Sequence, residues 1–193
     1  NHGIKFQRTD LPGQPIVDAD VDNVVDLSRG TTIEQSGARI NTVEHTLAAL
    51  TGLQIDNVLI QIDGPEPPIM DGSSEKFVEA LEFAGMEEQN ALRNFFEVPE
   101  SISYKDRSRE VEIGALPLND YRVTVMVDYN SPVLGSQHAM LSHISEFKTE
   151  IASSRTFCFL HELEMLYKQG LIKGGDVNNA IVVVDRVVES DEL

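Results

Sequence analysis

The sequence contains very little cysteine, and this excludes a disulfide-stabilised fold. Cys158 is the one cysteine among 193 residues, so no disulfide can form within the chain. A lone thiol is typical of proteins in a reducing compartment, and we therefore expect a cytoplasmic protein. No apolar run approaches the roughly 20 residues that a membrane-spanning helix needs, and no signal peptide is visible. Stable insertion into a membrane is not expected.

Basic residues are also scarce. Lysine and arginine number 15 against 32 aspartates and glutamates, which gives a net charge of −17. Such a charge argues against nucleic acid or an anionic membrane surface as the main partner. The 41% of hydrophobic residues and 24% of charged residues are ordinary for a soluble globular protein. The length suffices for one large domain or two small ones.

Several catalytic signatures are missing. The sequence has no phosphate-binding glycine loop, no Ser-His-Asp signature, no C-x-x-C and no H-E-x-x-H. Four of the five histidines stand in unrelated contexts, and we expect them at the surface: His2, His138, His143 and His161. The fifth, His45, follows Glu44 at the start of an apolar helical pattern and is a candidate for chemistry.

Short strand patterns and about two helices occur in each half of the chain, which favours an α+β fold over a wound parallel sheet. The polar residues 87–94 are the best domain boundary and predict domains at 1–93 and 94–193. In the first half we expect strands at 4–7 and 57–62, a hairpin or flap around 31–33, and helices at 43–51 and about 74–84. In the second half we expect strands at 95–98, 102–104, 111–113, 121–128 and 179–184, and helices at 145–152 and 160–169.

Residues 41–74 are the most informative stretch. Asn41 with Glu44 three residues later has the pattern of a capping box, and Gly52 stands where a helix-capping glycine belongs. A histidine in the first turn of a helix is more often a hydrogen-bonded structural residue than a metal ligand. These residues alone therefore favour a structural interpretation of Glu44 and His45.

Two further segments can be interpreted in two ways. The turn DGPEPPIMDGSS contains Asp71 and ends in two serines, which suit a rigid connection and a helix cap as well as a site. Thr156 could be the N-cap of a helix, or its hydroxyl could donate to a developing oxyanion. The apolar segment after Thr156 could be core, or it could line a passage for a fatty chain.

Four motifs together resemble one family, the LpxC family of zinc-dependent UDP-3-O-acyl-N-acetylglucosamine deacetylases of lipid A biosynthesis. They occur in the family's order and spacing, from about residue 3 to residue 188: TVEHTLAALTGLQIDN, DGPEPPIMDGSS, SSRTFCFL and GLIKGGDVNNAIVV. The resemblance implies two α+β domains of similar topology, with helices sandwiched between two β-sheets. It also implies an active site between the domains.

The resemblance assigns roles residue by residue. Glu44 of the TVEH motif would be the general base, and His45 would bind Zn²⁺. Thr156 of the R-T-F motif would polarise the substrate carbonyl and stabilise the oxyanion, and Asp71 of the PIMDG motif would have a supporting role. The substrate would be a UDP-linked acylated glucosamine.

The resemblance also implies two inserts near the site. Residues 24–37 would form a small sheet at its edge, and residues of about 157–182 would form the hydrophobic passage for the acyl chain. The residues expected to line or flank that passage are Phe157, Phe159, Leu160, Leu163, Ile172, Ala180 and Val182.

The chain also departs from the family pattern. The opening G-x-G-L-H segment, the H-K-x-x-D motif with two zinc ligands, and a later general-acid histidine do not occur in it. We therefore expect a chain truncated at both ends, which alone binds zinc weakly and is inactive. One alternative is a non-catalytic α+β binding domain in which Glu44 is only a helix cap. Another is a two-function polypeptide in which a second enzyme, such as a hydroxyacyl dehydratase, is fused to the deacetylase.

Overall fold

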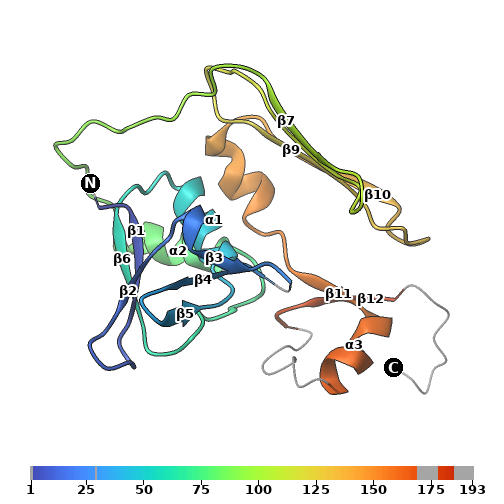
Figure 1. Cartoon of the computed structure of the whole chain (residues 1–193), viewed down its shortest axis with the longest axis horizontal. Coiled ribbons are helices and arrows are strands. Elements are labelled where there is room, and N and C mark those ends of the chain that lie inside the picture. Colours follow the sequence, from blue (N-terminus) through green and yellow to red (C-terminus); the bar gives the residue numbers. More distant parts are fainter. Residues whose placement is uncertain (1, 29, 169–177, 185–193) are drawn as a thin grey trace.

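The computed structural model describes residues 2–28, 30–168 and 178–184. Helices and several small sheets alternate along the described chain, and the expected α+β class is confirmed. Figure 1 shows the first half at one side of the molecule and the long strands of the second half extending away from it.

The first sheet has the strand order β2-β1-β6. Strand β1 (Ile4–Arg8) pairs antiparallel with β2 (Ile16–Asp18) and parallel with β6 (Val58–Ile62). Phe6 and Val17 face each other in register and are fully buried. Along β6 every second residue is exposed, which confirms the alternation predicted for residues 57–62.

A second, smaller sheet covers the first and has the order β3-β4-β5. Its strands are antiparallel: β3 (Val24–Asp26), β4 (Thr32–Gln35) and β5 (Ala38–Ile40), with the short 3₁₀ helix η1 (Val21–Asn23) before them. Buried side chains of both sheets form one core cluster: Phe6, Val17, Ile33, Ala38, Ile40 and Val43. The flap expected around residues 31–33 is therefore a packed three-stranded sheet.

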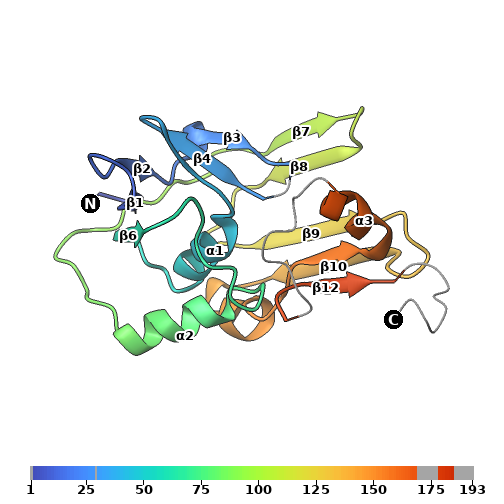
Figure 2. The ribbon, with the colours of Figure 1, turned by 90° about the horizontal axis from the view of Figure 1, so that it is seen from below.

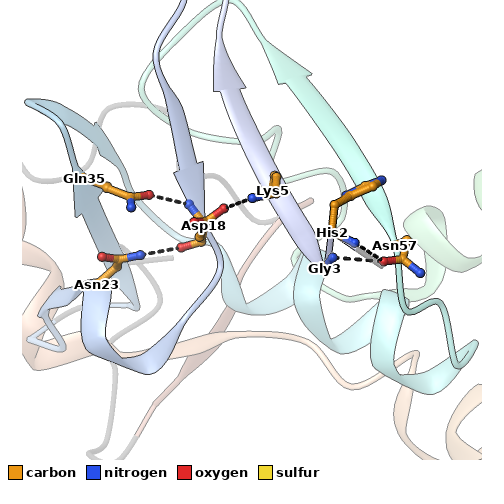
Figure 3. Close-up of polar contacts among 7 residues, drawn as sticks. All are labelled: His2, Gly3, Lys5, Asp18, Asn23, Gln35 and Asn57. Atoms are coloured by element: carbon orange, nitrogen blue, oxygen red, sulfur yellow. Dashed lines mark hydrogen bonds and ion pairs between the residues drawn. The ribbon is translucent and has the colours of Figure 1, made fainter. Parts of the chain in front are cut away.

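Asp18 joins the two sheets (Figure 3). Its carboxylate forms an ion pair with Lys5, and this hydrogen bond lowers the pKa of Asp18 below its ordinary value. Its amide donates to the side-chain oxygen of Gln35 on β4 at 2.9 Å, and its carbonyl accepts from Asn23 at 2.9 Å. The small sheet is thus fixed to the edge of the first one.

Two helices pack on the other side of this core: α1 (Glu44–Gly52) and α2 (Glu75–Ala84). In Figure 2, α1 lies between the first sheet and the strands of the second half, and α2 lies below α1. Leu47 of α1 packs against the sheet core, whereas Ala49 belongs to a second buried cluster with Phe147. The small side chains of α1 therefore let both layers approach it closely.

Gly52 is one point of close approach, and its predicted role is wrong. It is the last residue of α1, and the C-cap position belongs to Leu53. A Cβ added at Gly52 would lie 2.0 Å from Cδ1 of Phe147. The glycine therefore serves helix packing and not helix termination.

The second half contains two long hairpins. They consist of β7 (Ile102–Asp106) with β8 (Val111–Ala115), and β9 (Val123–Asp128) with β10 (Ser136–Leu141). The strands predicted at 102–104, 111–113 and 121–128 are confirmed, and β10 was not predicted. The strand predicted at 95–98 is wrong, because none of the strands that the structure describes pairs with these residues, and Phe95 instead lies beneath the Arg93 guanidinium.

The helix predicted at 145–152 is confirmed only as short non-α turns. A 3₁₀ turn, η2 (Ile144–Glu146), is followed by a π-helical turn, η3 (Phe147–Ile151), which closes with a 2.8 Å bond from the Ala152 amide to the Phe147 carbonyl. Phe147 is buried by α1 and α2, and Lys148 forms an ion pair with Glu82 of α2 at 2.7 Å. These turns therefore attach the second half to the helices of the first.

The described chain ends in a small β-α-β arrangement. Strand β11 (Phe157–Phe159) pairs in parallel with β12 (Ile181–Val183), and α3 (Leu160–Lys168) follows β11 directly. The helix predicted at 160–169 and the strand predicted at 179–184 are both confirmed. None of the described helices has the length and apolar character needed to cross a membrane.

Candidate active site

Glu44 opens α1, but it does not cap the helix. The N-cap residue is Val43, and no side chain caps this end, so the predicted capping box is wrong. The Asn41 side chain instead accepts a bond from the Thr32 hydroxyl at 3.2 Å. The Glu44 carboxylate reaches the neighbouring loop, where it accepts the Thr31 amide at 2.9 Å. The capping interpretation of Glu44 therefore loses its geometric basis.

His45 is half-buried beside Glu44. Its main-chain carbonyl accepts the Ser74 hydroxyl at 3.0 Å. Within the described residues, no hydrogen bond or ion pair engages its imidazole. A neutral imidazole with a free nitrogen is the form that binds a metal ion.

The turn of residues 71–74 connects the start of α1 to the start of β11. At one end the Ser74 hydroxyl bonds to the His45 carbonyl, and at the other the Gly72 carbonyl accepts the Thr156 amide at 2.8 Å. Two hydrogen bonds and the turn between them thus bring the main chain of Thr156 into the neighbourhood of the main chain of His45, although 110 residues lie between them in the sequence. The structure therefore brings three of the predicted site residues into one region.

Gly72 is required by this junction. It has a φ of +82°, and a Cβ there would lie 2.0 Å from the main-chain oxygen of Asn179 and 3.2 Å from Cγ2 of Thr156. A larger residue would push β11 and the segment before β12 away from the turn.

Asp71 holds the turn through its neighbours. Burial would raise the pKa of its carboxyl, but the hydroxyl and amide of Ser73 both donate to Oδ1, at 2.7 and 3.1 Å, and keep that pKa below its ordinary value. The Ser73 hydroxyl also accepts the amide of Glu75 at 3.1 Å, at the start of α2. The ionised carboxylate is thus part of the support of the turn.

Thr156 lies just before strand β11, so the first of its two interpretations, a helix N-cap, is wrong. Its amide donates to Gly72, and its carbonyl accepts the Ile181 amide at 3.0 Å. Its hydroxyl makes no hydrogen bond to any residue that the structure describes. The main chain of Thr156 is therefore fixed on both sides, and its hydroxyl can donate to a substrate oxygen.

Arg155 clamps the same junction. Its Nε donates to the Asp71 carbonyl at 2.7 Å, and Nη2 donates to the Asn178 carbonyl at 2.6 Å. The two carbonyls come from segments that are far apart in sequence. The forked guanidinium suits this task, because one planar group serves both acceptors.

The clamp leads to a stability prediction. Replacing Arg155 by lysine is expected to lower the free energy of unfolding by about 1–3 kcal/mol, because the single ammonium nitrogen lacks the planar fork whose two separated nitrogens reach the two carbonyls. Urea unfolding of the full-length protein measures the change. Arg109→Lys is the matched control. The Arg109 side chain is 82% exposed, so this substitution is expected to leave the free energy of unfolding almost unchanged. Equal stabilities of both variants would contradict the clamp.

The residues expected along the acyl passage come together around β11 and β12. Phe157 and Phe159 are on β11, with ring centroids 5.8 Å apart in an edge arrangement, and Tyr129 contacts Phe157 from the β9–β10 turn at 5.4 Å. The others follow or pair with this strand: Leu160 and Leu163 on α3, Ala180 just before β12, and Val182 on it. Ile172 lies outside the described residues. A passage between these side chains remains a prediction.

The structure adds residues that the sequence patterns did not indicate. The Thr31 amide bonds to the Glu44 carboxylate, Gly30 lies so close to it that an added Cβ would be 2.9 Å from Oε1, and Ser74 bonds to the main chain of His45. All three contacts join segments that are distant in sequence, so no local pattern reveals them. The fork of Arg155 was visible only as a basic residue before Thr156.

Within the described residues, no three histidine, cysteine, aspartate or glutamate side chains lie close enough together to hold a metal ion. The unbonded imidazole of His45 suits one ligand position of a zinc site. A complete site needs further donors in addition to those that the described residues bring together.

Comparison with known proteins identifies the family. A family model described as UDP-3-O-acyl N-acetylglycosamine deacetylase, LpxC, matches residues 1–193. A bifunctional enzyme LpxC/FabZ of Chlorobaculum tepidum is 49% identical over 194 residues, which are 100% of this chain and 42% of that protein. One from Bacteroides thetaiotaomicron is 46% identical, over 99% of this chain and 41% of that protein.

Monofunctional relatives are similar as well. A UDP-3-O-acyl-N-acetylglucosamine deacetylase of Acidithiobacillus ferrooxidans is 40% identical over 195 residues, which are 100% of this chain and 64% of that protein. The chain thus spans about two-fifths of its bifunctional relatives and somewhat less than two-thirds of this deacetylase.

Proposed function

Because the chain belongs to the LpxC family of deacetylases, we propose that its full-length protein removes the N-acetyl group of UDP-3-O-acyl-N-acetylglucosamine. The reaction would be a zinc-dependent hydrolysis in lipid A biosynthesis. The observation that carries the proposal is the turn of residues 71–74, which joins the helix end bearing Glu44 and His45 to the strand that follows Thr156. The cytoplasm, which is reducing, is the compartment that we propose.

His45 is the residue of this chain that would hold the zinc ion. Zinc, when bound, polarises a carbonyl group and lowers the pKa of water. Glu44 takes a proton from the water that attacks the acetyl carbon, since its carboxylate stands one residue from His45. The Thr156 hydroxyl donates a hydrogen bond to the oxygen on which negative charge develops.

The reaction balances as a hydrolysis. Water adds to the acetyl carbon, the carbon–nitrogen bond breaks, and acetate and the amine of the glucosamine unit are released. The amine needs a proton as it leaves, and the resemblance to the family assigns that step to a histidine outside this chain.

Thr156 provides the test of this proposal. Thr156→Val keeps the shape of the side chain but removes the donor, so it is expected to lower kcat for acetate release by about 10²–10³-fold. Thr156→Ser keeps the hydroxyl and is the matched control, with kcat within about tenfold of wild type. Both variants are expected to unfold at the wild-type temperature. A Thr156→Val protein with undiminished kcat would contradict the role of the hydroxyl.

The acyl chain of the substrate would lie along the apolar β11–α3–β12 unit. Phe157 and Phe159 provide aromatic surface at its start, and Leu160, Leu163, Ala180 and Val182 continue it. This unit directly follows Thr156, so a chain bound there would leave the sugar close to the reacting groups.

We further propose that the full-length protein has two functions. The bifunctional LpxC/FabZ relatives are 49% and 46% identical to this chain, and this favours a fusion to a second enzyme of the lipid pathway, such as a hydroxyacyl dehydratase. The coding sequence downstream decides the matter: an H-K-x-x-D motif followed by a second domain is expected there. A stop codon soon after the deacetylase motifs would contradict the fusion.

A further inference from the structure

We propose that Gly30 and Thr31 position the Glu44 carboxylate for catalysis: the Thr31 amide binds it, and Gly30, which has no Cβ, leaves the space that it occupies. The inference rests on the proposed function, in which Glu44 is the base. It goes further because it assigns a task to the loop that leads into the small sheet.

Thr31 is joined to the first residues of α1 by two main-chain contacts. Its amide donates to Oε2 of Glu44 at 2.9 Å, and its carbonyl accepts the amide of Val43 at 3.2 Å. The first contact orients the carboxylate, and the second fixes the distance between the loop and the helix end. Neither contact depends on the side chain of Thr31.

Gly30 lies beside the other oxygen of the same carboxylate and leaves room for it. A Cβ added at Gly30 would lie 2.9 Å from Oε1 of Glu44 and 3.6 Å from its Cδ. One carboxylate oxygen of Glu44 therefore bonds to the Thr31 amide, and the other occupies the space beside Gly30 that a Cβ would crowd.

The atom that would meet a new Cβ decides what a substitution does. At Gly30 that atom is the end of a flexible side chain, so the crowding is relieved by moving the carboxylate of Glu44. At Gly72 it is a main-chain carbonyl, so the fold itself must shift. The φ of Gly30 is +156°, so alanine there also strains the backbone, as it does at Gly37, but the close contact itself is relieved by displacing the carboxylate of Glu44.

The loop of residues 30 and 31 is anchored to the small sheet. It leads directly into β4, where Thr32 and Ile33 are buried, and Gln35 at the far end of β4 accepts the amide of Asp18 at 2.9 Å. Figure 3 shows this attachment to the first sheet. The small sheet thereby holds residues 30 and 31 in place against Glu44.

Gly30→Ala in the full-length protein tests the inference, with Gly37→Ala as the matched control. Gly37 lies in the β4–β5 turn of the same sheet, also has a positive φ of +75°, and has nothing within 4 Å of an added Cβ. Gly30→Ala is expected to lower kcat about 10–100-fold, because a misplaced catalytic group reacts slowly. KM and zinc content are expected to stay at wild-type values, and the melting temperature is expected to fall no further than in Gly37→Ala, whose kcat stays normal.

A double variant separates positioning from general damage. If Gly30 acts through Glu44, then Gly30→Ala adds no further loss to the residual kcat of Glu44→Gln. A full additional loss in the double variant would overturn the inference, as would a Gly30→Ala protein with wild-type kcat. Equal losses of kcat in Gly30→Ala and Gly37→Ala would overturn the inference too.

A crystal structure of Gly30→Ala gives a result that does not depend on turnover. The Glu44 carboxylate is expected to have moved off the Thr31 amide, and an unmoved carboxylate would overturn the inference. Failure of the proposed function has a different signature, namely a wild-type protein that releases no acetate or a Glu44→Gln protein that retains turnover. The crystal structure still decides whether Gly30 sets the position of Glu44.

Discussion

Replacing Glu44 by glutamine in the full-length protein is expected to lower kcat for deacetylation by about 10³–10⁴-fold, near the upper end of what a general base contributes. Glutamine has nearly the same shape and can still lie beside the loop of residues 30 and 31, but it cannot take a proton from water. His45 is untouched, so the zinc content is expected to remain at the wild-type level. Acetate release and metal analysis of the same preparation measure both quantities.

The matched control is Glu34→Gln on the small sheet. Glu34 is exposed, and its only ion pair among the described residues is a 3.7 Å contact with Arg39, so its neutralisation is expected to leave kcat unchanged. A Glu44→Gln protein within tenfold of wild-type kcat would show that Glu44 is not the base. Loss of zinc from this variant would instead show that the carboxylate belongs to the metal site.

Replacing Gly72 by alanine is expected to lower the free energy of unfolding by about 3–5 kcal/mol, the range of severe backbone and packing conflicts. The added Cβ would lie 2.0 Å from the Asn179 main-chain oxygen, and alanine disfavours the φ of +82° found here. Relief requires the turn to separate from β11, which also loosens the amide of Thr156. Urea unfolding measures the stability, and kcat is expected to fall as well.

Gly85→Ala separates the two causes of this effect. Gly85 has nearly the same φ of +83° at the end of α2, but nothing lies within 4 Å of an added Cβ. Replacing Gly85 by alanine is expected to lower the free energy of unfolding by only about 1–2 kcal/mol, which is the cost of the left-handed backbone conformation. Similar losses of unfolding free energy in Gly72→Ala and Gly85→Ala would show that the close approach to Asn179 does not matter for the junction.

The elements with a strong local pattern could be predicted from the sequence. The alternation of β6 and the apolar stripe of α2 set their positions, and Gly85 ends α2 as expected. Strand β10 was missed, because its residues become a strand only by pairing with β9. Residues 95–98 have residue types that are typical of a strand, but none of the described strands lies beside them to pair with.

The site could be predicted in part. Glu44, His45, Asp71 and Thr156 were named from motifs, and one turn joins the last three, whereas the Glu44 carboxylate bonds to Thr31. Their contacts could not be predicted, because they join residues that are distant in sequence, such as Thr31 with Glu44 and Gly72 with Thr156. The sequence pattern of a capping box was present, but the prediction was wrong, because α1 begins at Glu44 and its N-cap is Val43 and not Asn41.

The most direct test of the proposed function is acetate release from UDP-3-O-acyl-N-acetylglucosamine by the full-length protein, before and after zinc is removed and restored. The wild-type protein is expected to lose turnover with the metal and to regain it with one equivalent of zinc, whereas Glu44→Gln is expected to bind the zinc and remain inactive. Turnover that persists in the zinc-free protein, or that zinc restores equally in both proteins, would contradict the proposal.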